Sequence, residues 1–114
     1  LDVTRFDGVV VPGGMAPDYI RRHDRANRFV KYMDDEGKLV ASICHGAWVL
    51  CSAHGMLKGR KATCFFAIKD DVIHAGADYT DAEVVVDKNL VTSRKPDDLP
   101  AFMEACLKVL KAQG

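Results

Sequence analysis

The sequence lacks an excess of charge of either sign. Its 16 lysine and arginine residues balance 16 aspartate and glutamate residues over 114 positions, so the formal net charge is zero. With this balance the chain has no excess of positive charge to attract nucleic acid or an anionic membrane surface. We therefore expect no nucleic-acid partner.

Long apolar runs are also missing. No stretch approaches the roughly 20 consecutive apolar residues that a membrane-spanning helix needs. No basic segment leads into a short apolar region, as it does in a secretory signal peptide. We expect no membrane partner, and we expect a soluble, cytoplasmic protein.

The cysteines are not arranged for metal binding. The four cysteines are Cys44, Cys51, Cys64 and Cys106, and they form no C-x-x-C pair and have no zinc-type spacing to any histidine. We predict neither a metal site nor any other bound cofactor. A chain of this length can bury a core of its own without disulfides, and a reactive thiol fits the reducing cytoplasm.

What the sequence does contain is an alternation of strand and helix patterns along a single domain, residues 1–114. Short β-branched or apolar runs predict strands, and amphipathic or capped segments predict helices. The expected strands are 6–11, 39–43, 61–66, 82–86 and 90–93; the expected helices are 16–22, 25–36, one directly after position 44, 69–75 and one that starts within 97–100. Asp24 is the expected N-cap of the second helix. The alternation predicts an α/β fold with a mainly parallel sheet.

The junction at Cys44 is the centre of this pattern. Residues 39–43 have the continuous apolar character of a strand buried on both faces, and the residues after Cys44 fit a buried helix. A sharp turn there would lift the sulfur above the sheet, with Gly46 small enough for the helix to start without a clash, as in a nucleophile elbow. The helix dipole favours a thiolate, and free N–H groups at the helix start can hold an oxyanion. We expect Cys44 to be more acidic than a free cysteine and to act as a nucleophile.

Each candidate residue also has a structural interpretation. Cys44 could be an inert buried cysteine, the commoner fate of cysteines. Adjacent residues on a helix do not face each other, so His45 could line the pocket without acting on Cys44. Asp18 could be a solvated acid at a helix start. Trp48 is expected in the core or the pocket wall, and Arg94 in an ion pair.

Three motifs together resemble the DJ-1/ThiJ/PfpI superfamily, and its PfpI branch in particular. They are Pro-Gly-Gly-Met-Ala-Pro-Asp at 12–18, Ala-Ser-Ile-Cys-His-Gly at 41–46 and Val-Val-Val-Asp-Lys-Asn-Leu-Val-Thr-Ser-Arg at 84–94. The resemblance covers nearly the whole chain and implies a flavodoxin-like three-layer sandwich of the class I glutamine amidotransferase type. It also implies Cys44 as nucleophile, His45 as its base and Asp18, supplied by a neighbouring subunit, as the acid. The backbone N–H groups of Gly14 and His45 would form the oxyanion hole.

The chain departs from the family pattern in two places. The family often has a tyrosine where this chain has Phe65, so we expect no proton transfer by a hydroxyl there. The family also has a strand, a helix and a second strand before the Pro-Gly-Gly strand, with a glutamate that hydrogen-bonds the nucleophile. A βαβ unit takes roughly 30 or more residues, so about 50 residues of the family domain are expected to be absent before Leu1. That would leave strand 6–11 as an exposed edge, which another chain or a second copy would cover, and a homo-oligomer is therefore expected.

The predicted chemistry is attack of a thiolate on a carbonyl carbon. The resemblance favours a cysteine-dependent hydrolase of the PfpI type, an intracellular peptidase-like enzyme that acts on a peptide or a small-molecule carbonyl. The alternatives are a DJ-1-like glyoxalase or deglycase, a redox or stress-response protein whose Cys44 is oxidised, and an inactive assembly module. Peptidase and deglycase need the same nucleophile, so the residues favour neither.

Overall fold

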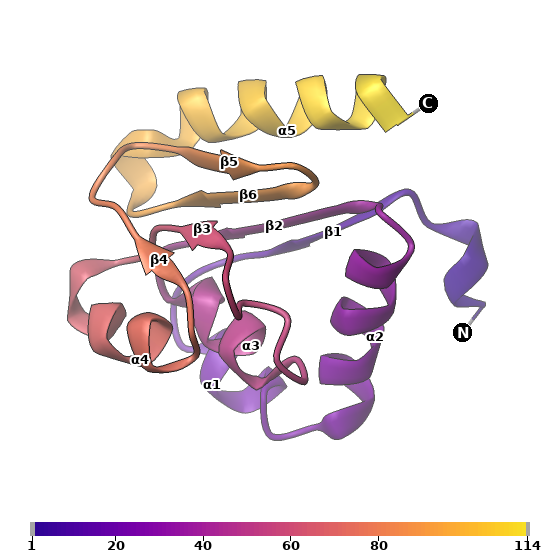
Figure 1. The fold of residues 1–114 in the computed structure, drawn as a ribbon, viewed down its shortest axis with the longest axis horizontal. Coiled ribbons are helices and arrows are strands. Elements are labelled where there is room, and N and C mark those ends of the chain that lie inside the picture. The colour runs from indigo at the N-terminus through magenta and orange to yellow at the C-terminus, as the bar shows by residue number, and fades with distance from the viewer. Residues whose placement is uncertain (1, 114) are drawn as a thin grey trace.

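The computed structural model describes residues 2–113 and arranges them in three layers around a central sheet (Figure 1). The strand order is β1-β2-β6-β5, with bounds Gly8–Val11 for β1, Leu39–Ile43 for β2, Leu90–Ser93 for β6 and Val85–Asp87 for β5. Strands β1, β2 and β6 run parallel, and β5 is the antiparallel partner of β6. The predicted flavodoxin-like α/β sandwich with a mainly parallel sheet is confirmed.

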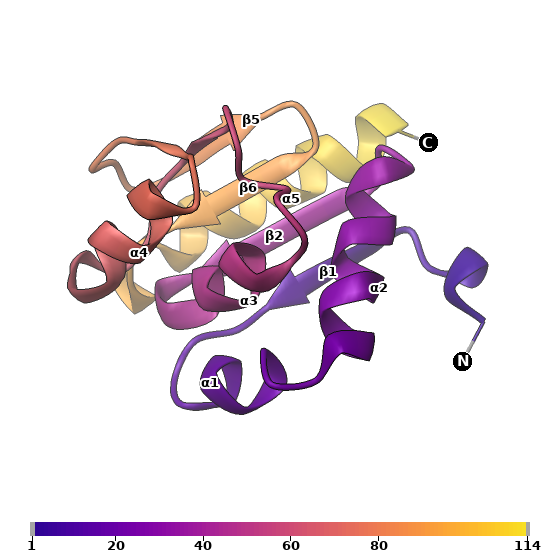
Figure 2. The ribbon, with the colours of Figure 1, turned by 60° about the horizontal axis from the view of Figure 1, so that its bottom comes forward.

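Helices cover both faces of the sheet. One face carries α1 Ala16–Ile20, α2 Asp24–Asp35, α3 Ala47–Ser52 and α4 Lys69–His74, and the other carries α5 Leu99–Gln113 (Figures 1 and 2). Short 3-10 turns are η1 Val3–Arg5, η2 Cys44–Gly46, η3 Phe66–Ile68 and η4 Pro96–Asp98. The strands β3 Lys61–Ala62 and β4 Asp78–Tyr79 form a separate parallel pair. Within residues 2–113, no helix combines the length and the apolar character needed to cross a membrane.

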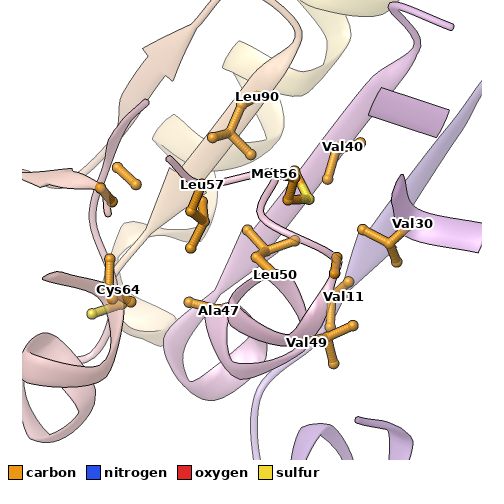
Figure 3. Close-up of a cluster of buried hydrophobic side chains, with 14 of the residues drawn as sticks. Val11, Val30, Val40, Ala47, Val49, Leu50, Met56, Leu57, Cys64 and Leu90 are labelled. Atoms are coloured by element: carbon orange, nitrogen blue, oxygen red, sulfur yellow. The ribbon is translucent and has the colours of Figure 1, made fainter. Parts of the chain in front are cut away.

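Strand β2 is buried along its whole length, as its apolar sequence predicts. Alternate residues of a strand point to opposite faces of the sheet. Leu39, Ala41 and Ile43 therefore meet α5 in one hydrophobic cluster that includes Phe102. Val40 points the other way, into a larger cluster formed with α2 and α3 (Figure 3). These two clusters hold the carboxyl end of β2, where Cys44 follows, in a fixed position.

Most element predictions are confirmed, with shorter bounds at several ends, and the strand predicted at 82–86 is shifted to Val85–Asp87. The N-cap prediction for Asp24 is wrong, because His23 occupies that position and Asp24 is the first helical residue. The carboxylate of Asp24 instead contacts Arg28 at 2.7 Å and His54 at 2.9 Å. A negative charge in the first turn still interacts favourably with the positive end of the helix dipole. The short strand β4 was not predicted.

The strand predicted at 61–66 ends at Ala62, because the chain then turns toward Cys44. The backbone N–H of Thr63 donates to Oγ1 of Thr92 on β6 at 2.9 Å. The N–H of Phe65 donates to the carbonyl of Cys44 at 3.3 Å. These two bonds replace strand pairing and bring Phe65 to the end of β2.

Strand β1 lies at the edge of the four-stranded sheet, as predicted, and Val10 on it is 49% exposed. A groove of about 980 Å³ lies nearby, lined by Val3, Ile20, Phe29 and Tyr32 among others. None of the predicted catalytic residues lines this groove. The groove is therefore separate from the Cys44 site.

Candidate active site

Cys44 occupies a sharp junction between β2 and the turn η2 that leads into α3. Its backbone φ is 61°, a left-handed conformation that is rare for residues other than glycine. Such outliers persist only where the surrounding structure holds them, and they gather at functional sites. The predicted elbow is therefore present, and the side chain of Cys44 is half-buried.

Gly46 allows this junction to pack against β1. A Cβ at position 46 would clash with the carbonyl oxygen of Val11 and would lie 3.1 Å from that of Pro12. The backbone φ of Gly46 is −55°, an ordinary helical value. Glycine is needed here for close approach, as predicted, and not for its conformational freedom.

The loop after β1 passes directly over the thiol. A Cβ at Gly13 would lie 2.8 Å from the Cβ of Cys44 and 3.4 Å from its Sγ. The next residue, Gly14, has φ +76° and open space around its Cα. The carboxyl ends of neighbouring parallel strands thus bring the Gly13-Gly14 loop and Cys44 together, at the edge where α/β sheets bind ligands.

His45 contacts the thiol although it is the next residue. Its Nδ1 lies 3.3 Å from the Sγ of Cys44, within hydrogen-bonding reach for sulfur. The left-handed φ of Cys44 takes the pair out of regular helical geometry, so the two side chains can face each other. A proton can therefore pass directly between sulfur and imidazole.

Two aromatic rings flank the imidazole of His45. The ring centroids of Trp48 and Phe65 each lie 5.0 Å from it, tilted by 59° and 32° respectively. Trp48 in turn donates its indole Nε1–H to Oδ2 of Asp71 on α4 at 2.9 Å. Trp48 is predicted in the core or the pocket wall, and its partly buried side chain packs against the larger core cluster.

Asp18 does not join this group within the chain. It lies in the first turn of α1, and its carboxylate forms an exposed ion pair with Arg22 at 2.7 Å. Among the side-chain hydrogen bonds of residues 2–113, none joins Asp18 to His45. The structure therefore brings Cys44 and His45 together but leaves Asp18 on the surface.

The other thiols are held in their protonated form. Burial raises the pKa of Cys51 to about 11, that of Cys64 to about 12 and that of Cys106 to about 11. Desolvation disfavours the charged thiolate, which is the reactive species. Cys44 differs from these three thiols because an imidazole lies beside its sulfur.

Arg94 also lies at this edge of the sheet, directly after the register pair Ile43 and Ser93. Its guanidinium bonds Asp98 at 3.0 Å and Asp81 at 2.9 Å. These hydrogen bonds, first to Asp98 and then to Asp81, raise the pKa of Arg94. The predicted ion-pair role is confirmed.

The described residues, 2–113, contain no group of three or more histidine, cysteine or acidic side chains that could hold a metal ion. The paired glycines after the first strand predict a close backbone passage, and the approach of Gly13 to Cys44 confirms it. Sequence reasoning missed the packing of Phe65 on His45 and the contact between Trp48 and Asp71. Both depend on which segments meet at the end of β2.

Comparison with known proteins supports the resemblance seen in the motifs. A profile of the DJ-1/PfpI family matches residues 1–109. The chain is 54% identical over 106 residues to a deglycase of Pyrococcus abyssi, covering 93% of this chain and 63% of that protein. It is 51% identical over 106 residues to the deglycase PfpI of Pyrococcus furiosus, with 93% and 63% covered. The chain thus spans about 63% of the length of these curated relatives.

A solved structure shares the fold. It is a two-domain protein of Anabaena variabilis that contains DJ-1/ThiJ/PfpI-like and ferritin-like domains. Its TM-score is 0.93 at 50% sequence identity, over 97% of this chain and 32% of that chain.

Proposed function

Because the chain belongs to the DJ-1/PfpI family, we propose that it is a cysteine-dependent enzyme whose Cys44 thiolate attacks a carbonyl carbon. The observation that carries the proposal is the elbow itself: Cys44 has φ 61° and its Sγ lies 3.3 Å from Nδ1 of His45. A strained nucleophile beside a base is the usual arrangement for covalent catalysis. A packing role alone would not need that strain.

In the first step, Nδ1 of His45 takes the proton of the Cys44 thiol. The sulfur then forms a bond to the carbonyl carbon, and the C=O π pair moves onto the oxygen. The resulting oxyanion accepts hydrogen bonds from backbone N–H groups, and the imidazolium returns the proton to it. For an aldehyde, the product of this step is a hemithioacetal, and no leaving group is expelled.

We assign the oxyanion hole to the backbone N–H groups of Gly14 and His45. Among residues 2–113, the backbone hydrogen bonds outside helices and strands include none donated by either group. Gly14 has open space around its Cα, and Gly13 brings the loop over the sulfur. Preorganised donors of this kind stabilise charge that develops in the transition state.

We propose a deglycase or glyoxalase type of substrate, in which the attacked carbon is the aldehyde carbon of an α-oxoaldehyde, either free or released when its adduct with an amine dissociates into aldehyde and amine. Addition to an aldehyde needs a single proton donor beside the sulfur, and His45 supplies it. Hydrolysis of an amide demands more, because the departing amine must be protonated and a water then activated. The relatives named deglycases, at 54% and 51% identity, support this choice.

Peptide hydrolysis would need the acid that orients His45, and we propose that Asp18 of a neighbouring copy supplies it. The exposed position of Asp18 supports this role, because a surface carboxylate can reach a second molecule. A homo-oligomer would then complete the site. The edge strand β1 offers a separate surface for such contacts.

The test compares methylglyoxal consumption and casein hydrolysis by the purified protein. We expect methylglyoxal consumption that Cys44→Ala abolishes and that Cys51→Ala, a substitution of a neighbouring thiol, retains. Equal consumption by the protein and by Cys44→Ala would overturn the proposal, since it would show reaction with surface amines alone. Casein hydrolysis without aldehyde consumption would favour the peptidase alternative.

A further inference from the structure

Trp48 lies between a carboxylate and the imidazole of His45. Its indole Nε1 donates to Oδ2 of Asp71 at 2.9 Å, and its ring centroid lies 5.0 Å from that of His45. Trp48 follows His45 by three positions, a spacing that places two side chains on the same helical face. One rigid ring therefore connects Asp71 on α4 with the base of the proposed site.

The imidazole of His45 is packed between aromatic neighbours and the thiol. Within residues 2–113, the side-chain hydrogen bond of His45 goes to Cys44, while Trp48 and Phe65 pack against its ring. When His45 takes the thiol proton, it becomes a cation. The face of an aromatic ring attracts a cation within about 6 Å of its centroid, and tryptophan does so best.

We propose that Trp48 and Asp71 are positioning residues that hold His45 and stabilise its imidazolium form, with Asp71 fixing the indole and the indole ring, 5.0 Å from the imidazole between centroids, supplying the attraction. This inference rests on the proposed function, because it assumes that His45 accepts the proton of Cys44. An indole whose N–H donates to a carboxylate is also the more electron-rich, which strengthens its attraction for a cation. Asp71 thus contributes both orientation and charge.

Other charged and titratable groups surround this pair. Arg21 on α1 has its Cζ 5.7 Å from the Trp48 centroid, and its Nε donates to Oγ of Ser52 at 2.9 Å. The thiols of Cys51 and Cys64 lie nearby and stay neutral because burial raises their pKa values. Arg21 repels an imidazolium, whereas Asp71 attracts it. The loss of Asp71 therefore leaves an unfavourable charge in place.

The test measures the rate at which iodoacetamide alkylates Cys44 as a function of pH, which reports the fraction of thiolate. We expect Trp48→Leu to lower the rate near pH 7 by about three- to fivefold and to move the rise of the rate to higher pH. Trp48→Phe keeps a ring but loses the N–H donor, so we expect a smaller shift in the same direction. Asp71→Asn keeps a hydrogen-bond acceptor but loses the charge. We again expect a lower alkylation rate near pH 7 and a rise of the rate at higher pH.

The matched control is Asp70→Asn, which removes an exposed carboxylate at the adjacent position of the same helix turn. It should leave the alkylation profile unchanged. An unchanged profile in both Trp48→Phe and Asp71→Asn, with circular dichroism showing the fold intact, would overturn the inference. The same would follow if Asp70→Asn shifted the profile as much as Asp71→Asn, since that would show a general charge effect.

This measurement uses no substrate, so it separates the two proposals. If Cys44 of the unchanged protein reacts no faster than the other three thiols, the proposed function itself fails. If Cys44 reacts quickly and the variants match the unchanged protein, only the role of Trp48 and Asp71 fails.

Discussion

The Sγ of Cys44 lies 3.3 Å from Nδ1 of His45, the very next residue in the chain. Consecutive side chains on a regular helix point in different directions. The pair can meet because Cys44 has a left-handed backbone and η2 precedes the regular helix α3. The same backbone twist thus exposes the sulfur and aims the base at it.

The first prediction concerns thiol selectivity. Iodoacetamide at neutral pH should modify Cys44 well before Cys51, Cys64 and Cys106, since burial holds their pKa values at about 11, 12 and 11. Mass spectrometry of the digested protein gives the order of modification. In urea all four thiols should react alike, which provides the control. Equal labelling in the native state would remove the distinction on which both catalytic and redox roles of Cys44 depend.

Gly13→Ala should block the thiol without unfolding the protein. The new Cβ would lie 2.8 Å from the Cβ of Cys44, so the loop or the sulfur must move. We expect alkylation of Cys44 to slow by about tenfold, because a shift of about 1 Å in a reacting group can cost far more. Gly55→Ala, which has φ +82° and open space, is the comparison and should leave the rate unchanged. A Gly13→Ala protein with an unaltered rate would contradict the close approach.

Gly46→Ala should destabilise the fold. Its Cβ meets the carbonyl oxygens of Val11 and Pro12, which are backbone atoms and cannot rotate away. Overpacking of this kind costs about 3 kcal/mol in the free energy of unfolding. Gly37→Ala has φ +72° in open space and should cost only about 1 kcal/mol, from backbone strain alone. Urea denaturation of both variants measures the difference, and equal losses would show that Gly46 is not sterically required.

Asp98→Asn should destabilise the protein in a pH-dependent way. Hydrogen bonds from Arg94, which outweigh the opposing effect of burial, lower the pKa of Asp98 below its ordinary value of 3.8. The stabilisation is therefore fully present above that value and is lost as the pH falls through the lower folded pKa.

We expect a loss of about 2 kcal/mol at pH 7, typical of hydrogen bonds to a buried charge. The difference between the protein and Asp98→Asn should shrink as the pH falls below 3.8. Asp97→Asn, at the exposed neighbouring position, should change the unfolding free energy by less than about 0.5 kcal/mol. A constant difference between pH 7 and pH 3 would argue against a charged role for Asp98.

Asp18→Asn tests the acid proposed to come from a second copy. Its ion pair with Arg22 is solvent-exposed, so the stability of the protein should change by less than about 0.5 kcal/mol. If Asp18 of a neighbouring copy completes the site for the peptidase alternative, casein hydrolysis should fall at least tenfold, while alkylation of Cys44 stays nearly unchanged. Asp35→Asn removes a similar exposed carboxylate, paired with Lys31, and serves as the control. Equal casein hydrolysis in both variants would show that Asp18 forms a surface ion pair and has no catalytic role.

The sequence predicts the elements that carry a strong local pattern. The strands β2 and β6 have the predicted bounds: β2 is a short, mostly apolar run, and β6 directly follows the turn residues Lys88 and Asn89. The elbow is predictable for a similar reason, since a cysteine between such a strand and a buried helix, with Gly46 two residues on, is typical of a nucleophile elbow. These features depend on residues close together in the chain.

Features that depend on distant partners escape prediction. The two-residue strand β4 at Asp78 and Tyr79 exists because it pairs with β3, and no run of its own marks it. The contact of Asp71 with Trp48 joins residues 23 positions apart. The N-cap prediction at Asp24 is wrong because aspartate is favoured both at the N-cap and in the first turn. The first two outcomes follow from tertiary packing, whereas the third reflects two local preferences of the same residue.

A β-carbon at Cys44 in a conformation that suits glycine costs about 1–2 kcal/mol. The thiol chemistry therefore requires a cysteine at position 44, whereas stability would favour a glycine there. Cys44→Gly would relax the backbone and erase the nucleophile in a single change. Selection for heat resistance alone would favour glycine at position 44, because it removes the backbone strain. Selection for reactivity would retain the cysteine despite that strain.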